Sequence, residues 1–241
     1  MKDRKSMLEI KNLEIGYPVS KGSFFSLFSG INLTASKGEL IAIVGKNGVG
    51  KSTLLRSIAG LQHSNNGKVT INNKLIGDYS RSEFAGLVSF VSTEIIHVNN
   101  LRVFDLVALG RFPHTNWFGK LEENDIIAVN KALEMVGMKS FTNKNINEIS
   151  DGERQRVMIA RTLAQDTQII ILDEPTAFLD LPNKYEIVHL LNNLAKTEGK
   201  TIIFSTHDLN IAIQEVDKIW LMLADGVKEG APEDLILNET F

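Results

Sequence analysis

The sequence predicts an α/β fold with a mostly parallel sheet, and three observations support this class. Short aliphatic and β-branched runs alternate with helical patterns along most of the chain, which is typical of a parallel sheet flanked by helices. One run, residues 169–172 (Ile-Ile-Ile-Leu), is wholly apolar, as expected for a strand covered on both faces. Two strand patterns, at residues 7–15 and 24–33, precede any helical pattern and predict a leading antiparallel sheet.

The remaining elements follow in chain order. Strands are expected at residues 39–44, 69–71, 87–91, 169–172, 201–205 and 218–223, and helices at 51–59, near 183–197 and near 209–215. Between about 103 and 165, apolar residues such as Ile126, Val129 and Leu133 recur at helical spacing, which predicts an inserted helical block. We therefore expect one domain over residues 1–241, with a core and β subdomain at about 1–90 and 160–241 and a helical subdomain at 91–159.

Composition narrows the classes of function. The chain has 241 residues, 43% hydrophobic and 23% charged, which is enough for a substantial core. No apolar run approaches the roughly 20 residues of a membrane-spanning helix, and the charged start is not followed by the apolar segment of a secretory leader. The absence of cysteine excludes disulfides and thiolate chemistry, and a net charge of −3 argues against nucleic acid as a partner. These features predict a cytosolic protein.

A glycine-rich segment after the strand at 39–44 has the pattern G-x-x-x-x-G-K-[ST]. Because it joins a strand to a helix, it predicts a loop whose backbone N–H groups and helix N-terminus bind phosphate. In such a loop Lys51 reaches the β- and γ-phosphates, and the Ser52 hydroxyl ligates Mg²⁺. The predicted phosphate-binding residues are Gly45, Lys46, Asn47, Gly48, Val49, Gly50, Lys51, Ser52 and Thr53.

Two acidic residues, Asp173 and Glu174, follow the apolar strand at 169–172. The carboxyl ends of parallel strands form the edge where open α/β sheets bind ligands. Asp173 is therefore predicted to hold Mg²⁺, directly or through water, and Glu174 to polarise an attacking water.

Further segments resemble the ATPases of ABC transporters. Residues 149–156 (Ile-Ser-Asp-Gly-Glu-Arg-Gln-Arg) resemble the signature of that family, and residues 178–180 (Phe-Leu-Asp) resemble its D-loop. Residues 205–208 (Ser-Thr-His-Asp) resemble the segment that carries its switch histidine, and Tyr17 matches the aromatic residue that stacks on adenine. The segments occur in the family's order across nearly the whole chain.

The resemblance implies a mechanism that needs two copies of the chain. Two subunits would meet head to tail around two ATP molecules, so that each phosphate loop faces Ser150 and Gly152 of the other copy. Glu174 would orient the water, and His207 would bridge the γ-phosphate, the water and the facing D-loop, which includes Asp180. The family further implies integral membrane permease subunits, an extracytoplasmic substrate-binding protein, and a peripheral location on the cytoplasmic side of the cell membrane.

The sequence departs from the family pattern at two places. Asp151 and Glu153 stand where the signature has a glycine and a glutamine, and an added carboxylate should repel a triphosphate unless its side chain turns away, as in capping its own helix. Thr93 and Glu94 follow the strand at 87–91, where the family has a Mg²⁺-contacting glutamine. Either residue offers an oxygen to the metal, with Thr93 favoured on electrostatic grounds, or both simply turn the chain.

Residues 107–114 (Val-Ala-Leu-Gly-Arg-Phe-Pro-His) resemble a stretch common in ATPases for uptake of iron–siderophore complexes, haem and cobalamin. The alternatives are an ABC ATPase of another importer class, or a segment that is simply a helix end stopped by proline. Trp117 and Phe118 lie nearby and are expected either at the permease interface or within the helical block. Phe24, Phe25 and Phe28 are expected in the core of the leading sheet.

Other classes of protein fit less well. A non-transport ABC ATPase with coiled-coil arms would need a longer insertion between Ser52 and Ser150, with sustained heptads. A GTPase would carry Asn-Lys-x-Asp, which is absent from this sequence. An interaction module with an inactive nucleotide site is disfavoured because Lys51, Asp173 and Glu174 are intact.

Overall fold

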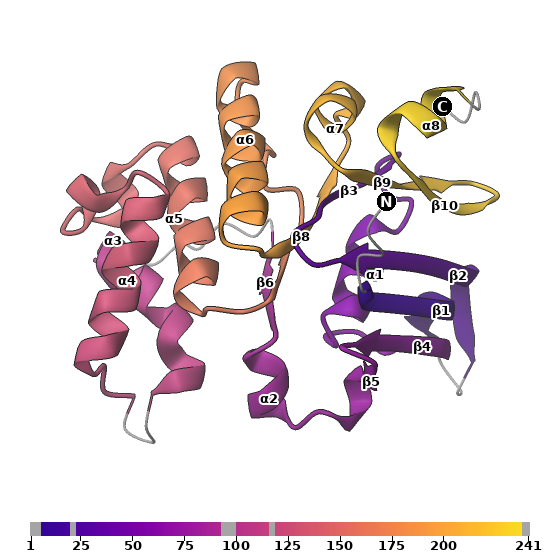
Figure 1. The fold of residues 1–241 in the computed structure, drawn as a ribbon, viewed down its shortest axis with the longest axis horizontal. Coiled ribbons are helices and arrows are strands. Elements are labelled where there is room, and N and C mark those ends of the chain that lie inside the picture. Colours follow the sequence, from indigo (N-terminus) through magenta and orange to yellow (C-terminus); the bar gives the residue numbers. More distant parts are fainter. Residues whose placement is uncertain (1–5, 20–22, 93–99, 116–118, 238–241) are drawn as a thin grey trace.

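The computed structural model describes residues 6–19, 23–92, 100–115 and 119–237. Within these ranges the strands form two sheets, and helices α3, α4 and α5 gather on the opposite side of β6 and β8 from strands β1, β2 and β4 (Figure 1). The α-helices are α1 (Lys51–Ile58), α2 (Arg81–Ala85), α3 (Val103–Ala108), α4 (Glu123–Met135), α5 (Asp151–Ala164), α6 (Leu181–Thr197), α7 (Leu209–Glu215) and α8 (Pro232–Leu237). The described residues also include the 3-10 helices η2 (Ile76–Asp78), η3 (Leu109–His114), η4 (Lys139–Phe141) and η5 (Ile146–Glu148).

The larger sheet is mostly parallel. In order across the sheet its described strands are β10 (Gly226–Gly230), β9 (Lys218–Leu223), β3 (Leu40–Gly45), β8 (Thr201–Thr206), β7 (Ile169–Leu172) and β6 (Val88–Val91). Only β10 runs antiparallel to its neighbour, and the other described pairs are parallel. The carboxyl ends of β3, β7 and β8 therefore lie along one edge.

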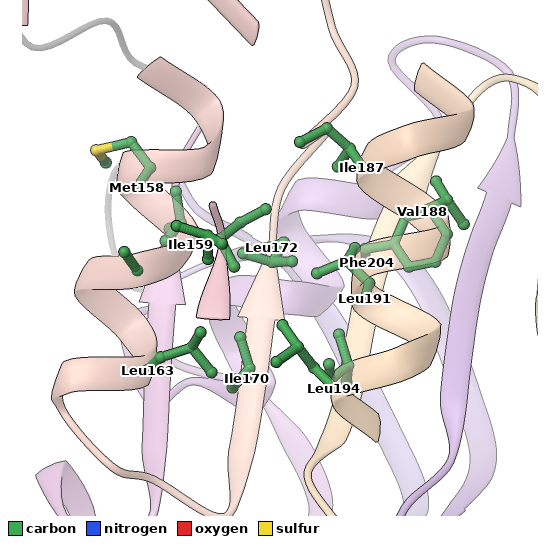
Figure 2. Packing of buried hydrophobic residues seen from close by; sticks show 14 of the residues in the cluster. Met158, Ile159, Leu163, Ile170, Leu172, Ile187, Val188, Leu191, Leu194 and Phe204 are labelled. Carbon is green, nitrogen blue, oxygen red and sulfur yellow. The ribbon is translucent and has the colours of Figure 1, made fainter. Parts of the chain in front are cut away.

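Both faces of this sheet are buried, because alternate residues of its strands point to opposite sides. In β7, Ile170 and Leu172 join one hydrophobic cluster while Ile169 and Ile171 join another. The first cluster is formed with α5 and α6. Figure 2 shows side chains of these two helices converging on Ile170, Leu172 and Phe204. The wholly apolar composition of β7 follows from this double coverage.

The smaller sheet is antiparallel and covers the other face. Its described strands, in order, are β2 (Phe24–Ser36), β1 (Ser6–Pro18), β4 (Asn66–Ile71) and β5 (Lys74–Leu75). Its inner residues pack with α1 and with Ile203 and Trp220 of the parallel sheet. The expectation for Phe25 was wrong: its side chain is 59% exposed, because β2 extends past the core at this end. Phe28 packs against the cluster, and Phe24 is half-buried.

η3 packs tightly against α4 and α5 within the helical block. Gly110 lies so close to α5 that an added Cβ would stand 2.1 Å from the Arg161 carbonyl oxygen, which only glycine permits. Arg111 donates to Asp125 (2.8 Å) and to the Ala164 carbonyl (2.8 Å), and this ion pair is largely buried. The backbone N–H of Glu122, and then Arg111, hold the pKa of Asp125 below its ordinary value. The pattern of residues 107–114 thus has a packing role.

The α/β class and the leading antiparallel sheet are confirmed. The prediction did not include β5, α2, β10 and α8, which are short and have weak periodicity. The division into a core and a helical subdomain, with limits at 91 and 159, remains a proposal. None of the helices in the described ranges has the length and apolarity needed to span a bilayer.

Candidate functional site

The phosphate loop joins β3 to α1 at the carboxyl edge of the parallel sheet. Gly50, the residue before α1, has a φ of 118°, a left-handed conformation that favours glycine. This conformation leads the chain directly into α1, so that the helix N-terminus and the loop share one concave surface. Such a terminus presents unpaired backbone N–H groups and positive dipole charge to an anion.

Lys51 is the cation of this loop. Its side chain is only 4% exposed, and its ammonium group donates to the carbonyl oxygens of Gly45 (3.0 Å) and Lys46 (3.3 Å). The same nitrogen lies 3.7 Å from Glu174 Oε1. The loop therefore holds a fixed positive charge beside the carboxylate that ends β7.

Hydroxyl groups converge on Asp173. Ser52 Oγ donates to Asp173 Oδ1 at 3.0 Å, and Ser205 Oγ donates to the same oxygen at 2.7 Å. Ser205 Oγ in turn accepts the backbone N–H of Glu174 at 2.8 Å. Asp173 is buried, with 3% exposure. One network thus joins the phosphate-loop helix, the end of β7 and the end of β8.

This donor set fits Mg²⁺. A hydroxyl and one carboxylate, with phosphate oxygens and water completing the sphere, are the ligands this ion prefers. In the described part of the chain, no group of three or more His, Asp or Glu side chains is placed to hold a metal. Ser52 and Asp173 offer two neighbouring oxygens that could hold Mg²⁺ at this edge of the sheet.

Tyr17 lies at the rim of the loop. It is the last residue but one of β1 and is 48% exposed, and its hydroxyl is 2.7 Å from Thr53 Oγ1 in α1. The contact places Tyr17 beside the first turn of α1, and an aromatic side chain at this rim could stack on a base.

His207 follows β8 and is exposed. It lines an open hollow of about 600 Å³ together with loop residues Lys46, Asn47 and Val49. The structure thus brings His207, from the end of β8, to the same edge as the phosphate loop.

The signature segment opens α5 with a capping box. Ser150 is the N-cap, and Glu153 accepts both its backbone N–H (2.8 Å) and its hydroxyl (2.9 Å). Asp151 accepts from Arg154 at 3.0 Å. The expectation that a carboxylate here caps its own helix is therefore confirmed for Glu153, and Asp151 is paired instead with a cation.

Gly152 and Asp180 lie at neighbouring helix starts. A Cβ added to Gly152 would stand 3.3 Å from Asn183 Oδ1, and Asp180 accepts from Asn183 at its backbone (3.1 Å) and side chain (2.7 Å). Phe178, two residues before Asp180 in the sequence, is 84% exposed and has a φ of 65°. The signature and the D-loop-like segment therefore form one surface of the same chain.

The structure does not bring this surface to the phosphate loop of its own chain. No hydrogen bond or ion pair between described residues links 150–153 with 45–52. In Figure 1, α5 and α1 stand on opposite sides of β6 and β8. Thr93, Glu94, Trp117 and Phe118 lie outside the described residues.

The role of Ser205 as a link between Asp173 and Glu174 was not predicted from the sequence. The available signal was positional: β7 and β8 are parallel neighbours with Leu172 beside Phe204, so the residues that follow these two meet at the ligand edge. The local indication was a serine directly after the apolar run of β8, residues 202–204.

Comparisons with known proteins agree with this geometry. The sequence profile described as ABC transporter matches residues 28–177. The iron(3+)-hydroxamate import ATP-binding protein FhuC of Bacillus subtilis is 40% identical over 217 residues, covering 88% of this chain and 80% of that protein. The ferric enterobactin transport ATP-binding protein FepC of Escherichia coli is 32% identical over 241 residues, covering 99% and 87%. A dimeric ATP-binding cassette solved with ADP and phosphate matches with a TM-score of 0.78 and 29% identity, covering 94% and 99%.

Proposed function

Because this chain belongs to the ABC transporter ATPases, which bind and hydrolyse ATP, we propose that it drives an importer of iron complexes or cobalamin through a separate permease. The observation that carries the ATPase role is the hydrogen bond from Ser52 to Asp173, which joins residues 121 positions apart at the mouth of the phosphate loop. This hydrogen bond brings together the hydroxyl and the carboxylate that hold the metal ion during hydrolysis of a nucleoside triphosphate.

The residues of the site have distinct roles in this proposal. The loop from Gly45 to Thr53 binds the phosphates through backbone N–H groups, and Lys51 offsets the charge of the β- and γ-phosphates. Glu174 accepts hydrogen bonds from the attacking water and aligns it with the γ-phosphate. His207, at the same edge, holds the γ-phosphate and the water, and Tyr17 stacks on the adenine.

Mg²⁺ would be held by Ser52 and Asp173, where it offsets negative charge on the phosphate oxygens. The 3.0 Å separation of the two protein oxygens supports this assignment. We also propose Thr93 as a third residue that contacts Mg²⁺, on the basis of its position in the sequence after the strand at 87–91.

A second copy of the chain completes each site. The exposed D-loop-like surface and the signature lie apart from the phosphate loop of the same chain, so their contact with nucleotide requires a partner. In a head-to-tail dimer, Ser150 and Gly152 face the γ-phosphate bound by the other copy, with Asp180 nearby. ATP then stabilises the dimer and hydrolysis releases it. Transport would further require integral membrane permease subunits and an extracytoplasmic substrate-binding protein that delivers the cargo. This subunit would lie peripherally on the cytoplasmic side of the cell membrane.

The cargo proposal is supported by similarity alone. The named relatives are ATP-binding proteins for iron(3+)-hydroxamate import and for ferric enterobactin transport. Residues 107–114 resemble a stretch of the ATPases for uptake of iron–siderophore complexes, haem and cobalamin. Deletion of this subunit should abolish uptake of one labelled ferric chelate, haem or cobalamin, and restoration should require an intact Lys51. Unchanged uptake of all three would contradict the cargo assignment while leaving the ATPase role intact.

A further inference from the structure

We propose that Ser205 is a positioning residue that fixes the Mg²⁺ carboxylate and the water-aligning glutamate relative to each other. This inference rests on the proposed function, because it takes Asp173 as the metal ligand and Glu174 as the general base. Ser205 itself touches neither nucleotide nor water in this account and acts through its two neighbours.

The Ser205 hydroxyl uses both of its hydrogen-bonding capacities between these residues. It donates to Asp173 Oδ1 at 2.7 Å and accepts the Glu174 N–H at 2.8 Å. Ser205 is completely buried, so water cannot replace either bond if the hydroxyl is removed. The Ser205 hydroxyl oxygen thus links the Asp173 side chain and the Glu174 backbone N–H to strand β8.

The conformation of Glu174 explains why such a tie is needed. Its φ is 46°, which is uncommon for a residue with a side chain and persists only where the surroundings enforce it. The bond from its N–H to Ser205 holds this turn at the end of β7. The turn aims the carboxylate toward the phosphate loop, where Glu174 Oε1 lies 3.7 Å from the Lys51 ammonium.

Asp173 depends on Ser205 in a different way. Ser52 and Ser205 donate to the same carboxylate oxygen from α1 and from β8. If Ser52 ligated a metal through its oxygen, its position would follow the metal, whereas the Ser205 hydroxyl would orient the carboxylate from a strand that contacts no ligand. Residues that orient a metal ligand typically contribute about 10- to 100-fold to metal affinity.

The same strand offers a matched control. Thr201, at the opposite end of β8, is also fully buried, and its hydroxyl donates to the Ser36 carbonyl at 3.0 Å. Thr201→Val removes a buried hydroxyl far from the nucleotide edge. It should reduce stability about as much as Ser205→Ala and leave the site unchanged.

The test measures the Mg²⁺ concentration that gives half-maximal ATP binding, using displacement of a fluorescent nucleotide, together with steady-state hydrolysis and thermal unfolding. Ser205→Ala should raise that Mg²⁺ concentration about tenfold and lower kcat about tenfold or more, with the KM for ATP at saturating Mg²⁺ changed by no more than about twofold. Ser205→Thr retains the hydroxyl and should restore most of both values. Thr201→Val should change only the unfolding temperature.

Each outcome has a definite meaning. A Ser205→Ala protein with the wild-type Mg²⁺ requirement and kcat would overturn the inference, as would equal shifts in the Thr201→Val control. A wild-type protein that neither binds nor hydrolyses ATP would instead contradict the proposed function, so the two failures are distinguishable.

Discussion

The hydroxyl of Ser150 donates to the carboxylate of Glu153, its own helix's third residue, at 2.9 Å. The backbone N–H of Ser150 donates to the same oxygen, and the Glu153 N–H donates back to Ser150 Oγ at 3.3 Å. The serine that would face a partner's γ-phosphate is therefore already engaged by a carboxylate. Binding of a phosphate by Ser150 must compete with this capping box.

Replacement of Glu153 by glutamine should separate the role of its side chain as a helix cap from the effect of its negative charge. Glu153→Gln keeps an acceptor oxygen for the cap but removes a negative charge close to the phosphate of the opposing subunit. We expect ATP-dependent dimers to form at a protein concentration several-fold lower than for the wild type, since like-charge repulsion is relieved. Analytical ultracentrifugation with ATP measures this, and an unchanged or weaker dimer would contradict the placement of Glu153 near nucleotide.

The same carboxylate predicts a pH dependence of stability. The backbone N–H of Ser150, followed by its hydroxyl, holds the pKa of Glu153 below its ordinary value of 4.5. A carboxyl group whose pKa is lower in the folded state stabilises the fold above its unfolded pKa, and the contribution is lost as pH falls through the folded value. Glu153→Ala should cost about 1 kcal/mol at pH 7, and this cost should shrink below about pH 4.5.

Urea unfolding of wild type and variant at neutral and acid pH measures that change. Glu123→Ala removes a first-turn carboxylate of α4 and serves as the control. A cost for Glu153→Ala that stays constant down to pH 3 would show that the cap bond makes no charge-dependent contribution.

The ion pair between Arg111 and Asp125 predicts a large effect of a substitution far from the nucleotide. Their side chains are 11% and 6% exposed, so Arg111→Ala leaves a buried carboxylate without its cation. Loss of one partner of such a pair costs about 3–5 kcal/mol. Chemical denaturation measures this cost. Arg102→Ala breaks an exposed arginine–aspartate pair in the same region and should have a much smaller effect. Equal effects would contradict the structural role assigned to η3.

The main course of the fold was predictable because its signals are local. The alternation of strands and helices, and the fully apolar run of β7, follow from burial of both sheet faces. Short elements such as β10 and α8 gave no comparable signal, because they are fixed by pairing and packing with distant segments. Phe25 was misplaced for the same reason, since the sequence does not show where the core stops covering a long strand.

Part of the candidate site was also predictable from local sequence patterns, and part was not. The phosphate loop and the acidic end of β7 carry sequence patterns, and the structure places Ser52 beside Asp173. The link through Ser205 depends on β8 lying next to β7, which is a property of sheet order. The roles of these residues in catalysis remain predictions.

A mixed dimer tests whether each site is shared between two subunits. We combine a Lys51→Ala subunit with a Ser150→Arg subunit and isolate the heterodimer through two different affinity tags. In a head-to-tail arrangement, both defects fall in one site and the other site is intact, so about one ATP should bind per heterodimer. Each homodimer of either variant has two damaged sites and provides the control. Two equally damaged sites in the heterodimer would exclude this arrangement.

The central claim is that Glu174 aligns the attacking water in an ATP-bridged dimer, and Glu174→Gln tests it most directly. The variant retains the loop, Lys51 and the Ser52–Asp173 pair, so it should bind ATP. Its turnover should fall by about two to four orders of magnitude, because the amide is a much weaker base. Since ATP then persists, size-exclusion chromatography with ATP should show a stable dimer that is absent without nucleotide. Near-normal hydrolysis by Glu174→Gln, or a protein that stays monomeric with bound ATP, would contradict the account.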